Sequence, residues 1–322
     1  MVYIRVTGRA LVNIHSANAE GAVGNYMALS KIFIVRRKEG GYDVSEEPVI
    51  SGNMIKHWHA VIMTELLKSW GYNNICDNCK RHVMYRSILN KNNEFEYIKT
   101  CAIEDLHGFL DTQTNVRRES IVKFSFMIPV EEQRSEYSSI THNRVVVNEE
   151  GKIPKEEQAM MVMKREHASG VYGFLCSMDL AFAGVSLANP NEKLPLDERK
   201  IRAKASIAAL MGLLSGYFGA AQARALPIIK VIELICIASK KPIPNAIHGF
   251  YKDYAEETAS IVKVSFDKAL VMPDEIRVVA MGEKPVMAFK EKNIKIEEVK
   301  IEEVKAMSDA ITKIIEVSDN WF

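Results

Sequence analysis

Hydrophobic and polar positions alternate with a period of two along several segments, and each such segment predicts a β-strand. These strands are expected over residues 2–14, 27–36, 42–49 and 120–130. Gly40 and Gly41 separate the second and third of them, which predicts a hairpin. Continuous apolar segments predict further core strands at 171–185, 227–237 and 261–264. The small, Gly- and Asn-rich segment 16–25 is expected to be a loop.

A helical period begins at Ser51, a residue suited to cap a helix N-terminus, and continues to about Trp70. A second helix is expected over the Ala-rich segment 196–218. The tail repeats Lys-Ile-Glu-Glu-Val from Lys295 and again from Lys300, a spacing of acidic and basic residues that predicts an exposed terminal helix.

Two segments fit neither pattern. Residues 71–115 are irregular and rich in Asn, Lys and Glu, which predicts an insertion with short helices. Residues 131–165 are polar, and 141–147 and 159–165 resemble two strand arms, which predicts a projecting hairpin. The whole pattern predicts an α+β fold, with an antiparallel sheet that carries helices and has insertions between its strands.

Composition narrows the class of protein. The chain has 322 residues, 48% of them hydrophobic and 26% charged, with a net charge of +1. These values are typical of a globular domain, and they exclude a strong overall field that would attract nucleic acid. No apolar segment has membrane-spanning length, and the N-terminus lacks a signal-peptide core, so a cytoplasmic protein without membrane contact is expected.

The start of the first helix is the best candidate for anion binding. Helical spacing places Asn53, Lys56 and His57 on one side, next to the free N–H groups of the N-terminus at Ser51 and Gly52. A phosphate of a nucleic acid or a nucleotide would suit these groups. His57 and His59 point about 200° apart on a helix and cannot chelate one ion, so His59 is expected to pack in the interior.

Five cysteines in a chain of this class do not predict a disulfide framework. Cys176 and Cys236 stand in apolar segments and are expected in the core. The spacing of Cys76 and Cys79, with His82 and Cys101 following, offers the ligand types of a zinc site. A single Cys-x-x-Cys pair is a weak signal, so no metal or other cofactor is assigned from the sequence.

Four segments in order resemble the DevR-type backbone subunit of CRISPR Cascade complexes, the archaeal type I-A branch of the RAMP superfamily. They are Gly24-Asn25-Tyr26, the segment from Pro48 to His59, the segment from Lys164 to Tyr172, and the segment from Ala223 to Pro227. The resemblance spans most of the chain.

The resemblance implies a modified RRM-like (ferredoxin-like) core that forms a single domain over 1–322, with 71–115 as a finger-like helical insertion and 131–165 as a thumb-like hairpin. It implies a non-catalytic subunit that coats the spacer of a CRISPR RNA as a helical filament and presents the guide for pairing with target DNA. Other Cascade subunits, including the one that caps the 5′ handle, would be its partners.

The residues expected to bind RNA lie in the first helix, in the resembling segments and in the hairpin 131–165. The complete set is Asn25, Ser51, Gly52, Asn53, Lys56, His57, His142, Arg144, Met161, Arg165, Ser169, Gly170 and Arg224. Met161 would wedge against bases, as apolar side chains do in other nucleic-acid complexes. Gly170 would mark a close approach of RNA or of a neighbouring subunit.

Two alternatives stay open on the sequence alone. One is an RNA-processing metallo-nuclease that uses His107 or His142, with Asp105 and Asp111 near the first. The other is a nucleotide-binding metabolic enzyme with its phosphate site at the Ser51 helix. Neither has a recognisable catalytic motif in this chain.

Overall fold

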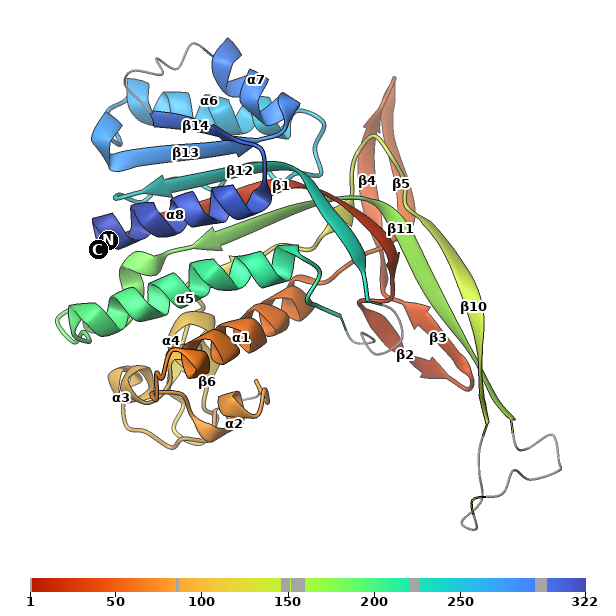
Figure 1. The fold of residues 1–322 in the computed structure, drawn as a ribbon, viewed down its shortest axis with the longest axis horizontal. Coiled ribbons are helices and arrows are strands. Elements are labelled where there is room, and N and C mark those ends of the chain that lie inside the picture. Colours follow the sequence, from red (N-terminus) through yellow and green to blue (C-terminus); the bar gives the residue numbers. More distant parts are fainter. Residues whose placement is uncertain (1, 85–86, 146–150, 152–159, 220–225, 293–299) are drawn as a thin grey trace.

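The computed structural model describes residues 2–84, 87–145, 151, 160–219, 226–292 and 300–322 (Figure 1). In that part of the chain ten strands form one sheet, and helices pack against both of its faces. On one side of the molecule the β10–β11 hairpin extends beyond this body (Figure 1).

The main path of the sheet runs in the order β14-β13-β12-β1-β11-β3-β2, and β8, β9 and β10 also pair with β11. All pairs are antiparallel except β13 with β14 and β11 with β3. The strands are β1 (Tyr3–His15), β2 (Ala19–Val23), β3 (Tyr26–Leu29), β8 (Val122–Phe124), β9 (Ile128–Pro129), β10 (Glu136–Val145), β11 (Met160–Met178), β12 (Ile228–Ser239), β13 (Ile276–Met281) and β14 (Lys300–Val304). Two separate hairpins pair β4 (Lys31–Lys38) with β5 (Gly41–Pro48), and β6 (Phe109–Leu110) with β7 (Arg117–Arg118).

Helices cover the two faces unequally. The helices are α1 (Gly52–Ser69), α2 (Asp77–Lys80), α3 (Glu94–Thr100), α4 (Ala102–His107), α5 (Leu196–Leu214), α6 (Tyr254–Asp267), α7 (Glu283–Glu291) and α8 (Met307–Trp321), with single 3-10 turns at Leu180–Phe182 and Pro273–Glu275. α1, α5 and α8 lie on one face, α6 and α7 lie on the other, and α2 to α4 lie beyond α1 (Figure 1).

β12 shows why the sheet needs helices on both sides. Leu234 and Cys236 belong to the core under α1, α5 and α8, while Ile235 and Ile237 belong to the core under α6 and α7. Successive side chains of a strand point to opposite faces, so this apolar run supplies both cores. Burying a side chain of this size stabilises the fold by roughly 1.5–3 kcal/mol relative to leaving it exposed.

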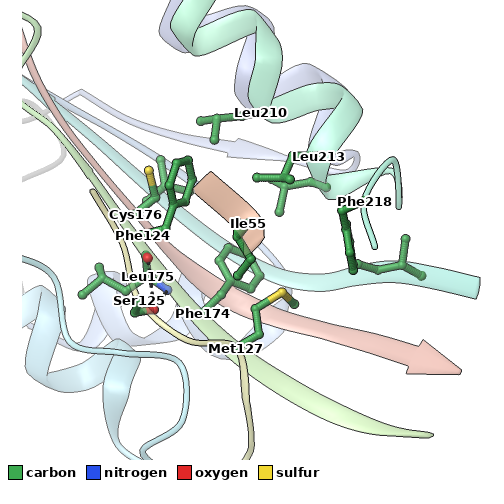
Figure 2. Close-up of a pocket in the computed structure, with 13 residues that line it drawn as sticks. Ile55, Phe124, Ser125, Met127, Phe174, Leu175, Cys176, Leu210, Leu213 and Phe218 are labelled. Atoms are coloured by element: carbon green, nitrogen blue, oxygen red, sulfur yellow. Dashed lines mark hydrogen bonds between the residues drawn. The ribbon is translucent and has the colours of Figure 1, made fainter. Parts of the chain in front are cut away.

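The larger core is closely packed around one small gap (Figure 2). A cavity of about 20 Å³ lies among Ile55 of α1, Leu213 of α5 and Phe174 of β11. The one polar side chain at its wall, Ser125, is hydrogen-bonded to the backbone of Leu175 at 3.0 and 3.1 Å. Because the lining is apolar and its polar groups are already bonded to each other, this cavity is a packing gap and not a ligand site.

Several predictions from the sequence are confirmed. The mixed α+β class holds, and the first helix has Ser51 as its N-cap and Trp70 as its C-cap. Residues 71–115 contain the short helices α2, α3 and α4. The hairpin predicted within 131–165 is formed by β10 and the first half of β11. None of the described helices is both long and apolar enough to cross a membrane.

Other element predictions are wrong, and tertiary contacts explain why. Residues 261–264 lie within the helix α6, because a short apolar run does not distinguish a buried helix from a strand. Residues 300–304 form the strand β14, although their composition favours a helix; pairing with β13 prevails over local propensity. Residues 19–23 of the expected loop form β2, which pairs with β3.

Two further strand predictions have different bounds. The segment 120–130 is interrupted, with β8 and β9 separated by an irregular stretch. The second arm of the hairpin and the core strand predicted from 171 are one continuous strand, β11, of 19 residues. The outer hairpin is therefore a direct extension of the central sheet.

Candidate functional site

The N-terminus of α1 is fastened to the body of the protein. The Ser51 hydroxyl accepts a hydrogen bond from the Met54 N–H at 3.3 Å and donates one to Oδ1 of Asn18 at 2.7 Å. Gly52 is buried, and a Cβ there would lie only 2.6 Å from the backbone oxygen of Phe124. Gly52 thus permits a close approach, but to the chain's own backbone. Ser51 and Gly52 therefore make contacts within the chain, and their role in binding a phosphate stays a prediction.

The neighbouring side of α1 is open. Asn53, Lys56 and His57 line one hollow of about 290 Å³, which we call the α1 hollow. Residues of the 71–115 insertion form its other wall, among them Asn78, Cys79, Val83, Met84, Glu104 and His107. The structure thus brings together the three side chains that helical spacing placed on one face, and adds a wall that the sequence did not indicate.

The α1 hollow holds one lysine, Lys56, and one carboxyl group, Glu104, whose pKa is raised to about 7 by burial. Burial, with Lys123 as a smaller cause, lowers the pKa of Lys56. Lys56 has no acidic partner within ion-pair distance among the residues that the structure describes. Burial also lowers the pKa of His57. Burial disfavours the charged form of Lys56, and the negative charge of a phosphate in this hollow would stabilise that charged form.

A histidine pair lies beneath the hollow. Nδ1 of His59 is 3.0 Å from Nε2 of His107, and Nε2 of His59 is 2.8 Å from the carbonyl oxygen of Ser206. A carbonyl only accepts, so Nε2 of His59 carries a proton and donates, and Nδ1 then accepts from His107. Burial lowers the pKa of His59 to about 4 and places that of His107 well below its usual value. The expectation that His59 packs in the interior is confirmed, since it is fully buried.

Asp105 and Asp111, the acidic residues predicted near His107, stabilise the fold. Asp105 accepts hydrogen bonds from Arg118 and Arg202, both at 2.8 Å, at the centre of a buried network. Asp111 accepts from the Tyr97 hydroxyl at 2.7 Å and from backbone N–H groups. These carboxylates are engaged in separate networks, so they do not form a metal site with His107.

The three cysteines of the insertion lie together. The sulfur atoms of Cys76, Cys79 and Cys101 are all within 4.8 Å of one another, and all three residues are buried. Hydrogen bonds with the other two thiols lower the pKa of Cys76, which accepts them, and raise that of Cys79, which donates. His82 is not part of this thiol cluster, because its Nε2 is 2.8 Å from Oε1 of Glu65 on α1. Pairing it with the cysteines on sequence spacing was wrong.

A second polar centre, which the sequence did not indicate, joins two of the resembling segments. Glu166 of β11 accepts hydrogen bonds from the Tyr26 hydroxyl, from the Leu29 N–H at 2.9 Å and from Nζ of Lys31 at 3.1 Å. Burial acts to raise the pKa of Glu166, but these hydrogen bonds outweigh it and hold the pKa below its usual value. We call these four residues the Glu166 network; their separation in sequence gave no sign of it.

The candidate residues near β11 have mainly internal contacts. The Asn25 carbonyl accepts a hydrogen bond from the Lys164 N–H at 2.8 Å, and its side chain is exposed. The Ser169 hydroxyl accepts one from the Ile14 N–H at 3.0 Å. Gly170 faces Ser135, whose Cβ would lie 2.9 Å from an added Cβ, so one close approach there is within this chain. An approach of RNA or another subunit to Gly170 stays a prediction.

The remaining candidates are spread along the hairpin. Arg165 is buried, and the half-buried His142 ring lies 6.0 Å from that of His167. Arg144 and Met161 face each other in the register of β10 and β11, and their side chains lie outside the described set. Arg224 lies outside the described residues. None of the described hairpin residues lines the α1 hollow, so the predicted set divides into two places.

Comparison with known proteins gives consistent matches. A family profile described as "CRISPR-associated negative auto-regulator DevR/Csa2" matches residues 6–259. A protein of Methanocaldococcus jannaschii named CRISPR-associated protein Cas7/Cst2/DevR is 38% identical, over 81% of this chain and 89% of that protein. A Saccharolobus solfataricus protein named CRISPR-associated aCascade subunit Cas7/Csa2 2 is 26% identical, over 90% of this chain and 98% of its own length.

A solved structure supports the fold. A chain of a CRISPR RNA-guided surveillance complex superposes with a TM-score of 0.51 at 11% identity, over 98% of this chain and 99% of that one. At this identity the likeness concerns the fold alone.

Proposed function

The chain belongs to the CRISPR-associated DevR/Csa2 family, and from that premise we propose that it is a backbone subunit of an antiviral Cascade-type complex that binds CRISPR RNA. Copies of the chain would associate head to tail along the guide spacer, since a heterologous interface that does not close on itself builds a filament. Other subunits would complete the assembly and the guide would pair with target DNA.

One observation carries the RNA-binding part of this proposal. Lys56, together with Asn53 and His57, lines an open hollow and has no acidic partner among the described residues. A half-buried cation of this kind gains most from a phosphate, and phosphate contacts hold a strand without reading its sequence. A guide-presenting subunit needs this kind of contact, because base pairing rather than the protein reads the target.

The architecture supports an assignment of parts. We assign the modified RRM-like core to the central antiparallel strands with their helices, the finger to 71–115 and the thumb to the β10–β11 hairpin within 131–165. The hairpin extends β11 beyond the body of the protein (Figure 1), where it could reach a strand or a neighbouring copy. The remaining hairpin candidates, His142, Arg144 and Met161, would act there.

The proposed subunit is not an enzyme. Its role is to hold RNA, and the Asp105 and Asp111 carboxylates, predicted near His107, are committed to structural networks. If the protein were a nuclease, RNA cleavage would depend on His107 or His142. The experiment below also measures such cleavage.

The direct test is assembly on RNA. Purified protein is mixed with labelled CRISPR RNA, with and without divalent metal, and analysed by gel filtration with absorbance at 260 and 280 nm. We expect intact RNA to co-elute with several copies of the chain. A protein that stays monomeric and free of RNA contradicts the proposal, and cleavage abolished by His107→Ala or His142→Ala would establish a nuclease instead.

A further inference from the structure

The thiol cluster of Cys76, Cys79 and Cys101 joins short helices of the insertion. Cys76 precedes the four-residue helix α2 and Cys79 lies within it, whereas Cys101 stands at the junction between α3 and α4. These helices have only four, seven and six residues. Helices this short gain little stability from their own hydrogen bonds, so tertiary contacts fix their placement.

The geometry of the cluster suits a metal ion. The three sulfur atoms lie within 4.8 Å of one another. In a tetrahedral zinc site, Zn–S bonds of about 2.3 Å place the sulfur atoms about 3.8 Å apart. Small side-chain rotations would therefore bring the three thiols to the required separation.

A carboxylate that would supply the fourth ligand lies on α4, outside the 4.8 Å grouping of the three sulfur atoms, so its side chain would have to rotate toward them. Glu104 lies three residues after Cys101 on α4, is 8% exposed, and lines the α1 hollow together with Cys79. Its Oε2 is buried without a hydrogen-bond partner among the described residues. A buried carboxylate oxygen without a partner is costly, and coordination to a cation would remove that cost.

The other two cysteines show what a packing role looks like in this protein. Cys176 on β11 and Cys236 on β12 are part of the core among aliphatic and aromatic side chains. Burial raises the pKa of both thiols, so they stay protonated and unreactive. The thiol cluster differs because its three sulfur atoms lie within 4.8 Å of one another.

We propose that the thiol cluster and the Glu104 carboxylate bind a structural Zn²⁺ ion that fastens α2 to the α3–α4 junction. Each thiol gives its proton to solvent as its sulfur bonds to the ion, and the carboxylate binds as the anion. Four protein ligands leave no open position for substrate, so the ion is structural. Because Cys79 and Glu104 line the α1 hollow, the ion would hold the wall opposite Lys56 in place. The site goes beyond RNA binding and stands without it.

The test is metal content under reducing conditions. Protein reduced, stripped of metal and reconstituted with Zn²⁺ is expected to retain about one zinc ion per chain by mass spectrometry. Replacement by Co²⁺ should give the thiolate-to-cobalt charge-transfer absorption and the intense visible bands of a tetrahedral site. Zinc retention near zero, or a Cys76–Cys79 disulfide that persists in reducing buffer, overturns the proposal. RNA binding is not part of this readout, so its failure and that of the RNA proposal are distinguishable.

Matched variants separate the site from packing. Cys101→Ala should lose the zinc, whereas Cys236→Ala, which also removes a buried thiol, should keep it; zinc retained in both overturns the proposal. If Cys101→Ala does not fold, a thiol-modifying mercurial added to the wild-type protein should release the ion, and zinc that stays bound counts against the site. Glu104→Gln should lower zinc affinity by roughly tenfold or more, and unchanged affinity refutes Glu104 as the fourth ligand.

Discussion

The α1 hollow and the Glu166 network are two polar regions built from the resembling segments, and they use polarity in opposite ways. In the network, Glu166 binds three donors from β3 and β4, and its carboxylate is nearly inaccessible to solvent. In the hollow, Lys56 has no acidic partner among the described residues and faces a space of about 290 Å³. Satisfied polar groups fix a shape, whereas unsatisfied ones are available for a ligand.

The largest effect is expected in the Glu166 network and should be an effect on stability. Glu166→Ala leaves the Leu29 N–H and the Lys31 ammonium without their buried acceptor. Breaking a buried pair from one side costs about 3 kcal/mol or more of unfolding free energy. Urea unfolding measures it, with Glu46→Ala on the exposed face of β5 as the control. A loss below about 1 kcal/mol would mean that the network does not fix the β3–β11 junction.

The histidine pair beneath the hollow should make stability depend on pH. Burial lowers the pKa of His59 from 6.5 to about 4. The folded protein therefore binds fewer protons than the unfolded chain in that interval, so the stabilisation is complete above pH 6.5 and is lost as pH falls toward 4. His59 contributes roughly 3 kcal/mol to the change in unfolding free energy between pH 6.5 and pH 4.

Unfolding curves at pH 7.5 and pH 4.5 would measure this dependence in the wild-type protein and in His59→Gln. The variant should show a shallower change with pH, although it is less stable at both values. His82→Gln, which changes a partly exposed histidine, serves as the control. Equal slopes in the wild type and His59→Gln would refute the assignment of the pH dependence to this residue.

A smaller effect is expected in the hollow, and it should be an effect on binding. Lys56→Glu should weaken RNA binding by about 1.4 kcal/mol, or roughly tenfold, because it replaces a phosphate ligand with a like charge. The slope of log affinity against log salt should fall by about 1. Fluorescence anisotropy at several salt concentrations provides both values.

The control for this prediction is on the same helix. Lys68→Glu changes an exposed lysine in the last turn of α1, which is 2.8 Å from Glu65 and away from the hollow. It should leave RNA affinity nearly unchanged. If Lys56→Glu and Lys68→Glu weaken binding equally, only the overall charge of the protein matters and the hollow has no specific role.

The two regions also differ in how far the sequence predicted them. Asn53, Lys56 and His57 are within one helical turn of each other, so the period of 3.6 residues places them together before any tertiary contact is known. Glu166 is more than 130 residues from each of its partners, and pairing of β11 with β3 brings them together. No local period encodes such a contact.

The same distinction holds for the elements. Ser51 and the hydrophobic period that follows specified α1 at both ends, because capping and amphipathicity are local properties. The helix predicted from the repeat in the tail was wrong for residues 300–304. These residues obtain their hydrogen bonds from β13, and Ile301 packs against the smaller core. Where a partner strand supplies backbone bonds, helix propensities of a few tenths of a kcal/mol per residue do not decide the outcome.

The sequence by itself determined the α+β class, the first helix with its polar face, the helical insertion, the hairpin and the resemblance to one family. Tertiary structure alone decided that Gly52 packs against the backbone of Phe124, that His82 is not part of the thiol cluster, and that a wall from the insertion turns one face of α1 into a hollow. The physical reason is the sequence distance over which each kind of interaction acts. Periodicity, caps and motifs act over a few residues, whereas a site depends on which distant segments the sheet and its cores bring into contact.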